Sequence, residues 1–374
     1  MDAKEKVEVP DDTAEQLKVT VGKVNRYFSL EGPKGVSEKQ EHAISLFLND
    51  VDSEPLTWEM PHSILVTGSS GYLGSALMRY FRAKGITCIG LDLVPSITTD
   101  VVGSVTDLEM VRAAVQKHKC SATIHAGALH APNLDYFSAE EYEQVNVQGT
   151  ANILKVAGEA AQTAVVFSST TSLMASREVK ALEAEQDGPP VILSAEKSIG
   201  SPRNVYGTTK LAAEALCLSA ENKVNTCVLR CTRFFAEDIF ETDKPPESRG
   251  SSIPSGNLKA LEVLRGNRAS LKDTVMGHVR ALHLLHTAPT NSLKQGPLIL
   301  APSSPLVNQA EREETLARTR ALFQKLGWAF PLQNKRLFDT SSTWKALGIS
   351  ASLDYFKLLH HLERRDQAFL EGVY

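Results

Sequence analysis

The chain has 374 residues, of which 42% are hydrophobic and 22% charged, with a formal net charge of −4. This length allows two domains or one large α/β unit with a substantial core. The composition is that of an ordinary globular protein, and its charge gives no reason to expect nucleic acid or a membrane as a partner. Because every apolar run is too short to cross a bilayer, we expect no membrane-spanning segment.

Five cysteines are dispersed along the sequence without a CxxC pair, and several lie inside apolar runs. This pattern predicts buried, reduced thiols rather than a disulfide framework. The N-terminus is polar and has no signal-peptide pattern, so we expect a cytoplasmic protein. Clustered Cys and His at metal-ligand spacing are also missing from the sequence, and we expect no metal site.

Residues 1–61 precede the first predicted strand and form an N-terminal extension. Within it, Ser37-Glu38-Lys39-Gln40 resembles a capping box, the sequence signature of a helix start. The apolar residues that follow could give this helix one apolar side. We expect the segment either to cover an edge of the main domain or to join a second subunit.

From residue 62 to 235, apolar strands alternate with helices. This pattern predicts an α/β fold, a Rossmann-type doubly wound parallel sheet with helices on both faces. The expected helices lie near 107–118, 140–159 and 205–221, and residues 175–200 read as an irregular loop insertion.

Beyond residue 235 the alternation weakens, and residues 236–374 are expected to build a smaller substrate-binding lobe, partly interleaved with the sheet. The expected pieces there are a loop at 241–256, helices near 258–265 and 311–326, an apolar run at 297–300 and an amphipathic segment at 353–370.

The stretch Ile64 to Gly74 reads as an apolar strand, a glycine-rich turn and a helix start. Gly68 permits a sharp exit from the strand with positive φ, Gly71 lets backbone approach a phosphate, and Gly74 lets the helix lie against the strand. A helix start also favours a pyrophosphate through its free N–H groups. A glycine-rich corner without a ligand is the alternative interpretation.

Asp92 ends the second predicted strand, at the place where a carboxylate can accept hydrogen bonds from both ribose hydroxyls of an adenosine. The same carboxylate would repel a 2′-phosphate, and the following Leu93-Val94-Pro95-Ser96 contains no Lys or Arg to offset it. The sequence therefore predicts NAD rather than NADP as cofactor.

Tyr206 and Lys210 lie four residues apart on a predicted helix, and so on one face of it. An ammonium beside a phenol lowers the pKa of the phenol toward a range useful for proton transfer, and the same Lys can bind a nicotinamide ribose. A shared helix surface without chemistry is the alternative. At the end of a neighbouring predicted strand, Thr170 could hold a substrate oxygen beside Tyr206, although Ser168, Ser169 and Thr171 offer the same kind of hydrogen bond.

Taken together, these motifs resemble the extended short-chain dehydrogenase/reductases, the NAD-dependent epimerase/dehydratase family. The resemblance rests on TGxxGxxG at 67–74, Asp92, Asn146-Val147-Gln148-Gly149-Thr150, Ser168-Ser169-Thr170 and the Tyr206 to Glu214 segment with the following Leu229-Arg230. It implies Tyr206 as catalytic acid/base, Lys210 as its partner, Thr170 as the hydroxyl residue and Asn146 as a support of the active site. It also implies a homodimer formed by the helices near 146–159 and 205–221. The cofactor contacts are expected at Gly68, Ser70, Gly71, Tyr72, Leu73, Gly74, Asp92, Ser104, Val105, Ala126, Gly127, Ala128, Tyr206 and Lys210.

Several positions depart from the family pattern. Thr170 is followed by Thr171-Ser172-Leu173-Met174 without a carboxylate, which argues against a 4,6-dehydratase. Arg233-Phe234 stands where sugar-nucleotide enzymes usually have Asn-Pro, so the substrate stays open between a nucleotide sugar and another alcohol or ketone. Arg233 could bind an anion or form a surface ion pair, and His130 could face the crevice or lie in a solvated loop.

These observations predict an NAD-dependent oxidoreductase, an epimerase or a dehydrogenase, that transfers hydride at a secondary alcohol or ketone carbon of a small molecule. Two alternatives remain: an NADP-dependent reductase of a lipophilic ketone or aldehyde, and a non-catalytic scaffold that senses a dinucleotide.

Overall fold

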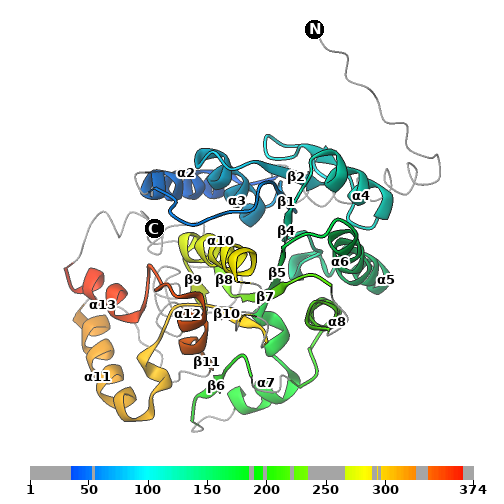
Figure 1. The fold of residues 1–374 in the computed structure, drawn as a ribbon. Coiled ribbons are helices and arrows are strands. Elements are labelled where there is room, and N and C mark those ends of the chain that lie inside the picture. The colour runs from blue at the N-terminus through cyan, green and yellow to red at the C-terminus, as the bar shows by residue number, and fades with distance from the viewer. Residues whose placement is uncertain are drawn as a thin grey trace.

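The computed structural model of the protein describes residues 35–52, 55–184, 189–196, 200–219, 223–234, 266–288, 293, 296–325 and 336–364. The loop expected at 241–256 and the helix expected near 258–265 lie outside these residues. Figure 1 shows a central sheet with helices on both sides and a group of helices from the C-terminal part beyond one edge.

Seven parallel strands form the central sheet, in the order β10-β7-β5-β4-β1-β2-β3. Their bounds are β1 Ile64–Thr67, β2 Cys88–Asp92, β3 Val101–Val102, β4 Ala122–His125, β5 Ala164–Thr170, β7 Thr226–Cys231 and β10 Leu298–Leu300. The strand order reverses between β1 and β4, and ligands bind at such a switch point in open α/β sheets. The predicted doubly wound parallel sheet is therefore confirmed.

The strands are apolar because both faces of the sheet are covered. Every residue of β1, β4, β5 and β7 is buried, including the serines and threonines at the carboxyl end of β5. As predicted, Thr170 lies at the end of its strand, because Ser168, Ser169 and Thr170 continue the pairing with β7.

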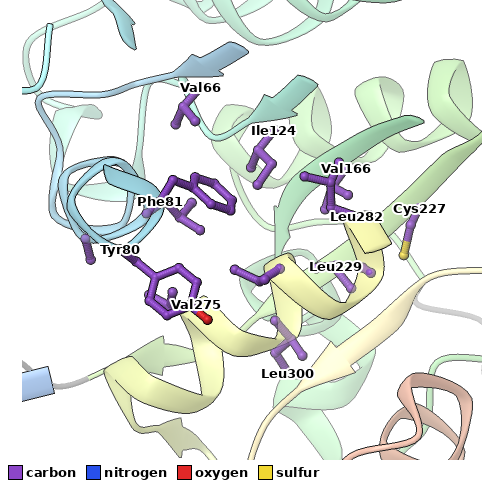
Figure 2. Close-up of a cluster of buried hydrophobic side chains, with 14 of the residues drawn as sticks. Val66, Tyr80, Phe81, Ile124, Val166, Cys227, Leu229, Val275, Leu282 and Leu300 are labelled. Carbon is purple, nitrogen blue, oxygen red and sulfur yellow. The ribbon is translucent and has the colours of Figure 1, made fainter. Parts of the chain in front are cut away.

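On one face of the sheet, Val66, Ile124, Val166 and Leu229 pack against α3 (Tyr72–Ala83) and α10 (Leu271–Thr287). Figure 2 shows these side chains directed toward Phe81 and Leu282. Because successive strand residues point to opposite faces, Leu65, Val165 and Val228 pack on the other side. That face is covered by α4 (Leu108–Lys117), α6 (Gly149–Glu159) and α8 (Val205–Leu218).

The N-terminal extension contributes α2 (Glu38–Asp52), which lies beside α3 (Figure 1). The predicted capping box is confirmed: the Ser37 N–H donates to Gln40 Oε1 (2.9 Å), and the Gln40 N–H donates to Ser37 Oγ (3.3 Å). Ile44 and Phe47 are buried in the core cluster shared with α3 and α10. Of the two expected roles, covering the main domain is the one seen in this part of the chain.

One expectation about local structure is wrong, and a second needs refinement. The described part of 175–200 contains α7 (Arg177–Ala184) and the short strand β6 (Val191–Leu193), which pairs in parallel with β11 (Arg336–Phe338). A strand of three residues is too short to show an alternating pattern in the sequence, and the partner of β6 lies far along the chain, so the sequence does not reveal the strand. The helix expected over 140–159 is present but not regular: it consists of α5 (Ala139–Tyr142), a π-helical turn at Glu143–Gln148 and α6.

The C-terminal part is shared between the sheet and an outer lobe. Helix α10 and strand β10 complete the Rossmann layers, while α11 (Gln309–Lys325), α12 (Ser341–Leu347) and α13 (Tyr355–Arg364) lie outside them (Figure 1). The remaining elements are short: β8 Arg233–Phe234 paired with β9 Arg268–Ala269, and the 3₁₀ turns Ala131–Asn133, Thr171–Met174 and Pro305–Val307. In the described ranges, none of these helices combines the length and apolar character that a bilayer crossing requires.

Candidate active site

The turn after β1 accepts only glycine at two positions. Gly68 has φ of +70°, and a Cβ there would lie 2.8 Å from the Cα of Gly127 at the end of β4. A Cβ on Gly74 would lie 2.0 Å from the carbonyl oxygen of Gly68. The glycines therefore bring the β1 turn, the start of α3 and the end of β4 into close backbone contact, which leaves room for a ligand at the switch point.

Asp92 stands at the carboxyl end of β2 and faces this turn. Its Oδ2 accepts a hydrogen bond from the Ser70 N–H (3.0 Å), and its Oδ1 accepts one from the Val94 N–H (3.0 Å). Burial raises the pKa of this carboxyl group, and the N–H donors counteract the rise. A carboxylate has about four acceptor positions, so it can still accept from a ribose.

A pocket of about 630 Å³ runs along the carboxyl ends of the strands. Every predicted cofactor contact except Lys210 lines it, including Ser104 and Val105 after β3 and Ala126, Gly127 and Ala128 after β4. Among the described lining residues Arg233 carries the one ammonium or guanidinium group, and it follows β7 rather than β2. In the described part of the chain, the ribose end beside Asp92 therefore offers a 2′-phosphate no cation, which fits NAD.

The sequence left four hydroxyl residues at the end of β5 as candidates for holding a substrate oxygen beside Tyr206. In the structure, each of them has a different partner. Ser168 Oγ lies 2.8 Å from His278 Nε2, Ser169 Oγ donates to Glu214, and Thr171 Oγ1 donates to the Cys231 carbonyl oxygen (3.4 Å). The Thr170 hydroxyl accepts from the Ser172 N–H (3.0 Å) and lies near enough to the Tyr206 phenol to lower its pKa. Three of the four residues line the pocket: Ser168, Ser169 and Thr170. Of these, Thr170 is the one beside Tyr206.

Tyr206 and Lys210 share α8 as predicted, but the expected lowering of the tyrosine pKa is not seen. Burial raises the pKa of the Tyr206 phenol to about 12, and the neighbouring Thr170 hydroxyl acts in the opposite direction. The Lys210 ammonium instead donates to the Ser168 carbonyl oxygen (2.7 Å) and lies 4.2 Å from the centre of the Phe167 ring. Burial lowers the pKa of Lys210 to about 8.

Asn146 lies in the π-helical turn, buried behind the pocket wall rather than in it. Its Oδ1 accepts from the Leu129 N–H (2.8 Å), and its Nδ2 donates to the Leu129 carbonyl oxygen (3.1 Å) and to Thr209 Oγ1 (3.1 Å). Asn146 thus ties the loop after β4 to helix α8, next to Lys210.

A second chain of hydrogen bonds holds the same loop. The Gly127 N–H donates to Thr67 Oγ1 (3.1 Å), which lies 2.7 Å from His125 Nδ1, while His125 Nε2 lies 3.1 Å from Thr150 Oγ1. Burial lowers the pKa of His125 to about 3, so the ring is neutral at physiological pH and can accept at one nitrogen and donate at the other.

At the other end of the pocket, His130 lines the wall with its ring centre 6.0 Å from that of Tyr206. His130 therefore lines the crevice while remaining exposed, so both alternatives for this residue describe part of its position. Arg233 also lines the pocket, and the adjacent Phe234 stacks on Tyr72 with ring centres 5.1 Å apart. Sequence reasoning missed two further lining residues, Gly35 and Gln40 of the N-terminal extension. Metal ligands are not gathered anywhere in the described residues: they contain no group of three or more His, Cys, Asp or Glu side chains arranged for an ion.

The model of the NAD dependent epimerase/dehydratase family matches residues 64–291, more than half of the chain. The chain belongs to this family.

Two curated relatives and one solved structure illustrate its range. A UDP-glucose 4-epimerase of Erwinia amylovora is 27% identical over 169 residues, covering 41% of this chain and 47% of the relative. A decarboxylating sterol-4-alpha-carboxylate 3-dehydrogenase of Candida albicans is 27% identical over 249 residues, covering 61% of this chain and 65% of the relative. The match thus spans about half the length of the epimerase and about two thirds of the dehydrogenase.

A short-chain dehydrogenase/reductase superfamily protein from Agrobacterium tumefaciens, solved with bound NAD, superposes with a TM-score of 0.53 at 22% identity. The superposition covers 82% of this chain and 98% of that one. At this identity the likeness concerns the fold, which agrees with the family assignment.

Proposed function

We propose that the protein is an NAD-dependent oxidoreductase that transfers hydride at a secondary alcohol or ketone carbon. The observation that carries the proposal is the placement of Thr170 beside Tyr206 in the wall of one pocket, whose other end holds the glycine turn and Asp92. Bound NAD supplies the hydride chemistry itself, as acceptor from an alcohol or, in its reduced form, donor to a ketone.

The roles of the side chains follow from their positions. Thr170 orients the substrate oxygen, and the Tyr206 phenol exchanges a proton with that oxygen. With a pKa of about 12, the phenol holds its proton at neutral pH and is ready to donate it to a ketone oxygen. In the oxidative direction, a cationic group close to the phenol would be needed to favour the phenolate, and Lys210, four residues further on α8, is the candidate.

Within this class, a redox-neutral epimerase and a net dehydrogenase remain the two forms of the proposal. The relatives include proteins of both kinds, and the matched region covers only part of each. Mass spectrometry of small molecules released on denaturation separates them. NAD retained in equal amount to the protein supports an epimerase, and reversible binding supports a dehydrogenase. Preference for NADP would contradict the role given to Asp92.

Substitution of Tyr206 by Phe tests the catalytic role. We expect NAD affinity to change by less than about threefold, while turnover falls by about 10²- to 10⁴-fold, because the proton-transfer group is lost and the pocket is kept. The assays are calorimetric NAD binding and NADH absorbance or product chromatography over a panel of secondary alcohols, ketones and sugar nucleotides. Tyr355→Phe, a buried tyrosine that does not line the pocket, is the matched control.

If Tyr206→Phe still binds NAD and functions as well as the unaltered protein, the alternative of a non-catalytic scaffold that senses a dinucleotide is favoured instead.

We also propose a homodimer formed through α6 and α8, which pack side by side, and a reducing compartment such as the cytoplasm. The five cysteines, all free and buried, support the second point. Sedimentation analysis of the purified protein and fluorescence microscopy of a tagged chain test these two proposals.

A further inference from the structure

We infer that Gln40, in the N-terminal extension, is a dinucleotide-binding residue whose side-chain amide donates a hydrogen bond to NAD at the glycine-rich end of the pocket. The inference rests on the proposed NAD site and adds to it a residue from outside the Rossmann unit. Gln40 is partly exposed and lines the pocket together with Gly35. Both residues precede the family match, which begins at residue 64.

The extension approaches the pocket at the glycine turn. Gly35 has φ of +92°, and a Cβ built on it would lie 3.6 Å from the carbonyl oxygen of Ser70. Ser70 belongs to the turn that also carries Gly71 and whose N–H binds Asp92. The backbone at Gly35 is therefore in van der Waals range of the turn that receives the pyrophosphate of the proposed cofactor.

The position of Gln40 is fixed by its helix. Glu41, the next residue, forms a two-pronged ion pair with Arg79 of α3, with distances of 2.5 and 2.8 Å. Near the other end of α2, Asp50 pairs with Lys272 of α10 (2.7 Å), and the Lys84 ammonium donates to the Val51 carbonyl oxygen (2.6 Å). With Ile44 and Phe47 buried between these contacts, α2 cannot turn without breaking core packing.

The two ends of the Gln40 amide differ in what they bind. Its Oε1 accepts the Ser37 N–H in the capping box. Its Nε2 has two N–H donors, and within the described ranges no acceptor atom pairs with them. A side chain that lines the pocket with free donors suits a ligand rich in phosphate and hydroxyl oxygens.

A pair of variants separates binding from helix capping. Gln40→Glu keeps the capping box, because Glu at this position accepts the same backbone N–H, but it replaces the donor by a carboxylate. Ser37→Ala breaks the box and leaves the Gln40 amide in place. We expect Gln40→Glu to raise the Kd for NAD at least about tenfold without lowering the melting temperature of the cofactor-free protein. Ser37→Ala should lower that melting temperature and change the Kd less than about threefold.

ADP-ribose, which lacks the nicotinamide, serves as a second probe in the same titrations. The loss in Gln40→Glu should be as large for ADP-ribose as for NAD, because the glycine-rich end receives the shared part of both molecules. A Gln40→Glu protein that binds NAD as the unaltered chain does overturns the inference, and so does an equal loss in both variants or a loss confined to NAD. If the unaltered chain binds neither compound, the proposed function itself fails.

Discussion

Glu214 and Arg230 form an ion pair that is almost completely removed from water, with 2% and 4% of their side chains exposed. Arg230 Nη2 lies 2.7 Å from Glu214 Oε2, and Arg230 Nε lies 3.0 Å from Glu214 Oε1. Ser169, beside Thr170 in the pocket wall, donates to the same carboxylate. The pair therefore joins α8 to β7 and to β5 next to Thr170, one of the residues proposed to act in catalysis.

We predict that Arg230→Met lowers the free energy of unfolding by about 3–5 kcal/mol, because it leaves the Glu214 carboxylate buried without its counter-charge. The double variant Arg230→Met, Glu214→Leu should recover most of that loss, since it removes both charges. Urea unfolding followed by circular dichroism measures both values. A double variant as unstable as the single one would show that packing, rather than charge, causes the loss.

For individual residues, the sequence predicted which ones line the pocket better than it predicted their pKa values and hydrogen-bond partners. The glycine turn, Asp92 and the Tyr206–Lys210 pair are local motifs, and all of them except Lys210 line the pocket. The pKa of Tyr206 was predicted in the wrong direction because it depends on burial by the whole fold. The choice among the β5 hydroxyls depends on distant partners such as His278, 110 positions further along the chain.

The π-helical turn between α5 and α6 supports the pocket wall from behind. It carries Asn146, whose amide holds both backbone groups of Leu129 and the Thr209 hydroxyl. Such turns occur often at functional sites, where they redirect a side chain that a regular helix would place elsewhere. The sequence placed Asn146 near the active site by resemblance, and its periodicity predicted an uninterrupted helix.

We predict that Asn146→Ala lowers stability by about 2–4 kcal/mol and also lowers turnover, because two buried backbone groups of Leu129 lose their partner beside the loop that lines the pocket. Asn152→Ala is the matched control: its Nδ2 donates to two backbone carbonyls as well, those of Val105 and Thr106 (3.0 Å each), but near the other end of the pocket. Unfolding curves measure the stability of the two variants, and the ratio of turnover to NAD affinity shows which variant loses catalysis beyond any loss of cofactor binding. Equal losses of turnover in both variants would contradict a specific role for Asn146.

The short elements were the hardest to predict. Strands β6 and β11 have three residues each and pair across about 145 residues of chain, so their order depends on contacts that are distant in the sequence. The long helices α8 and α11 agree with their predicted ranges to within a few residues.

Over the whole molecule, two buried histidines couple stability to pH. His125 lies in β4, and His278 of α10 bonds Ser168 Oγ (2.8 Å) and the Thr274 carbonyl oxygen (2.7 Å). Burial lowers the pKa of His125 to about 3 and that of His278 to about 4. Because an unfolded histidine titrates near 6.5, the unfolded chain takes up these protons first as the pH falls.

We predict that the free energy of unfolding decreases between pH 6.5 and pH 4.5, by about 1 kcal/mol per histidine at pH 5.5. His278→Gln should make this pH dependence shallower, whereas His42→Gln, on the exposed side of α2, should leave it unchanged. Denaturant titrations at half-unit pH steps measure the slope. A slope in His278→Gln equal to that of the unaltered chain would exclude His278 as a source.

The contact between α2 and α10 has a consequence for the newly synthesised chain. Asp50 and Lys272 are 222 positions apart, and at 5–20 residues per second a ribosome needs about 10 to 45 s to add the residues between them. During that interval the apolar side of α2, with Ile44 and Phe47, has α3 to cover it but not α10. Nascent chains of this protein should therefore expose part of the apolar side of α2 until α10 has been synthesised. We expect chaperones that recognise exposed apolar segments to bind α2 during this interval.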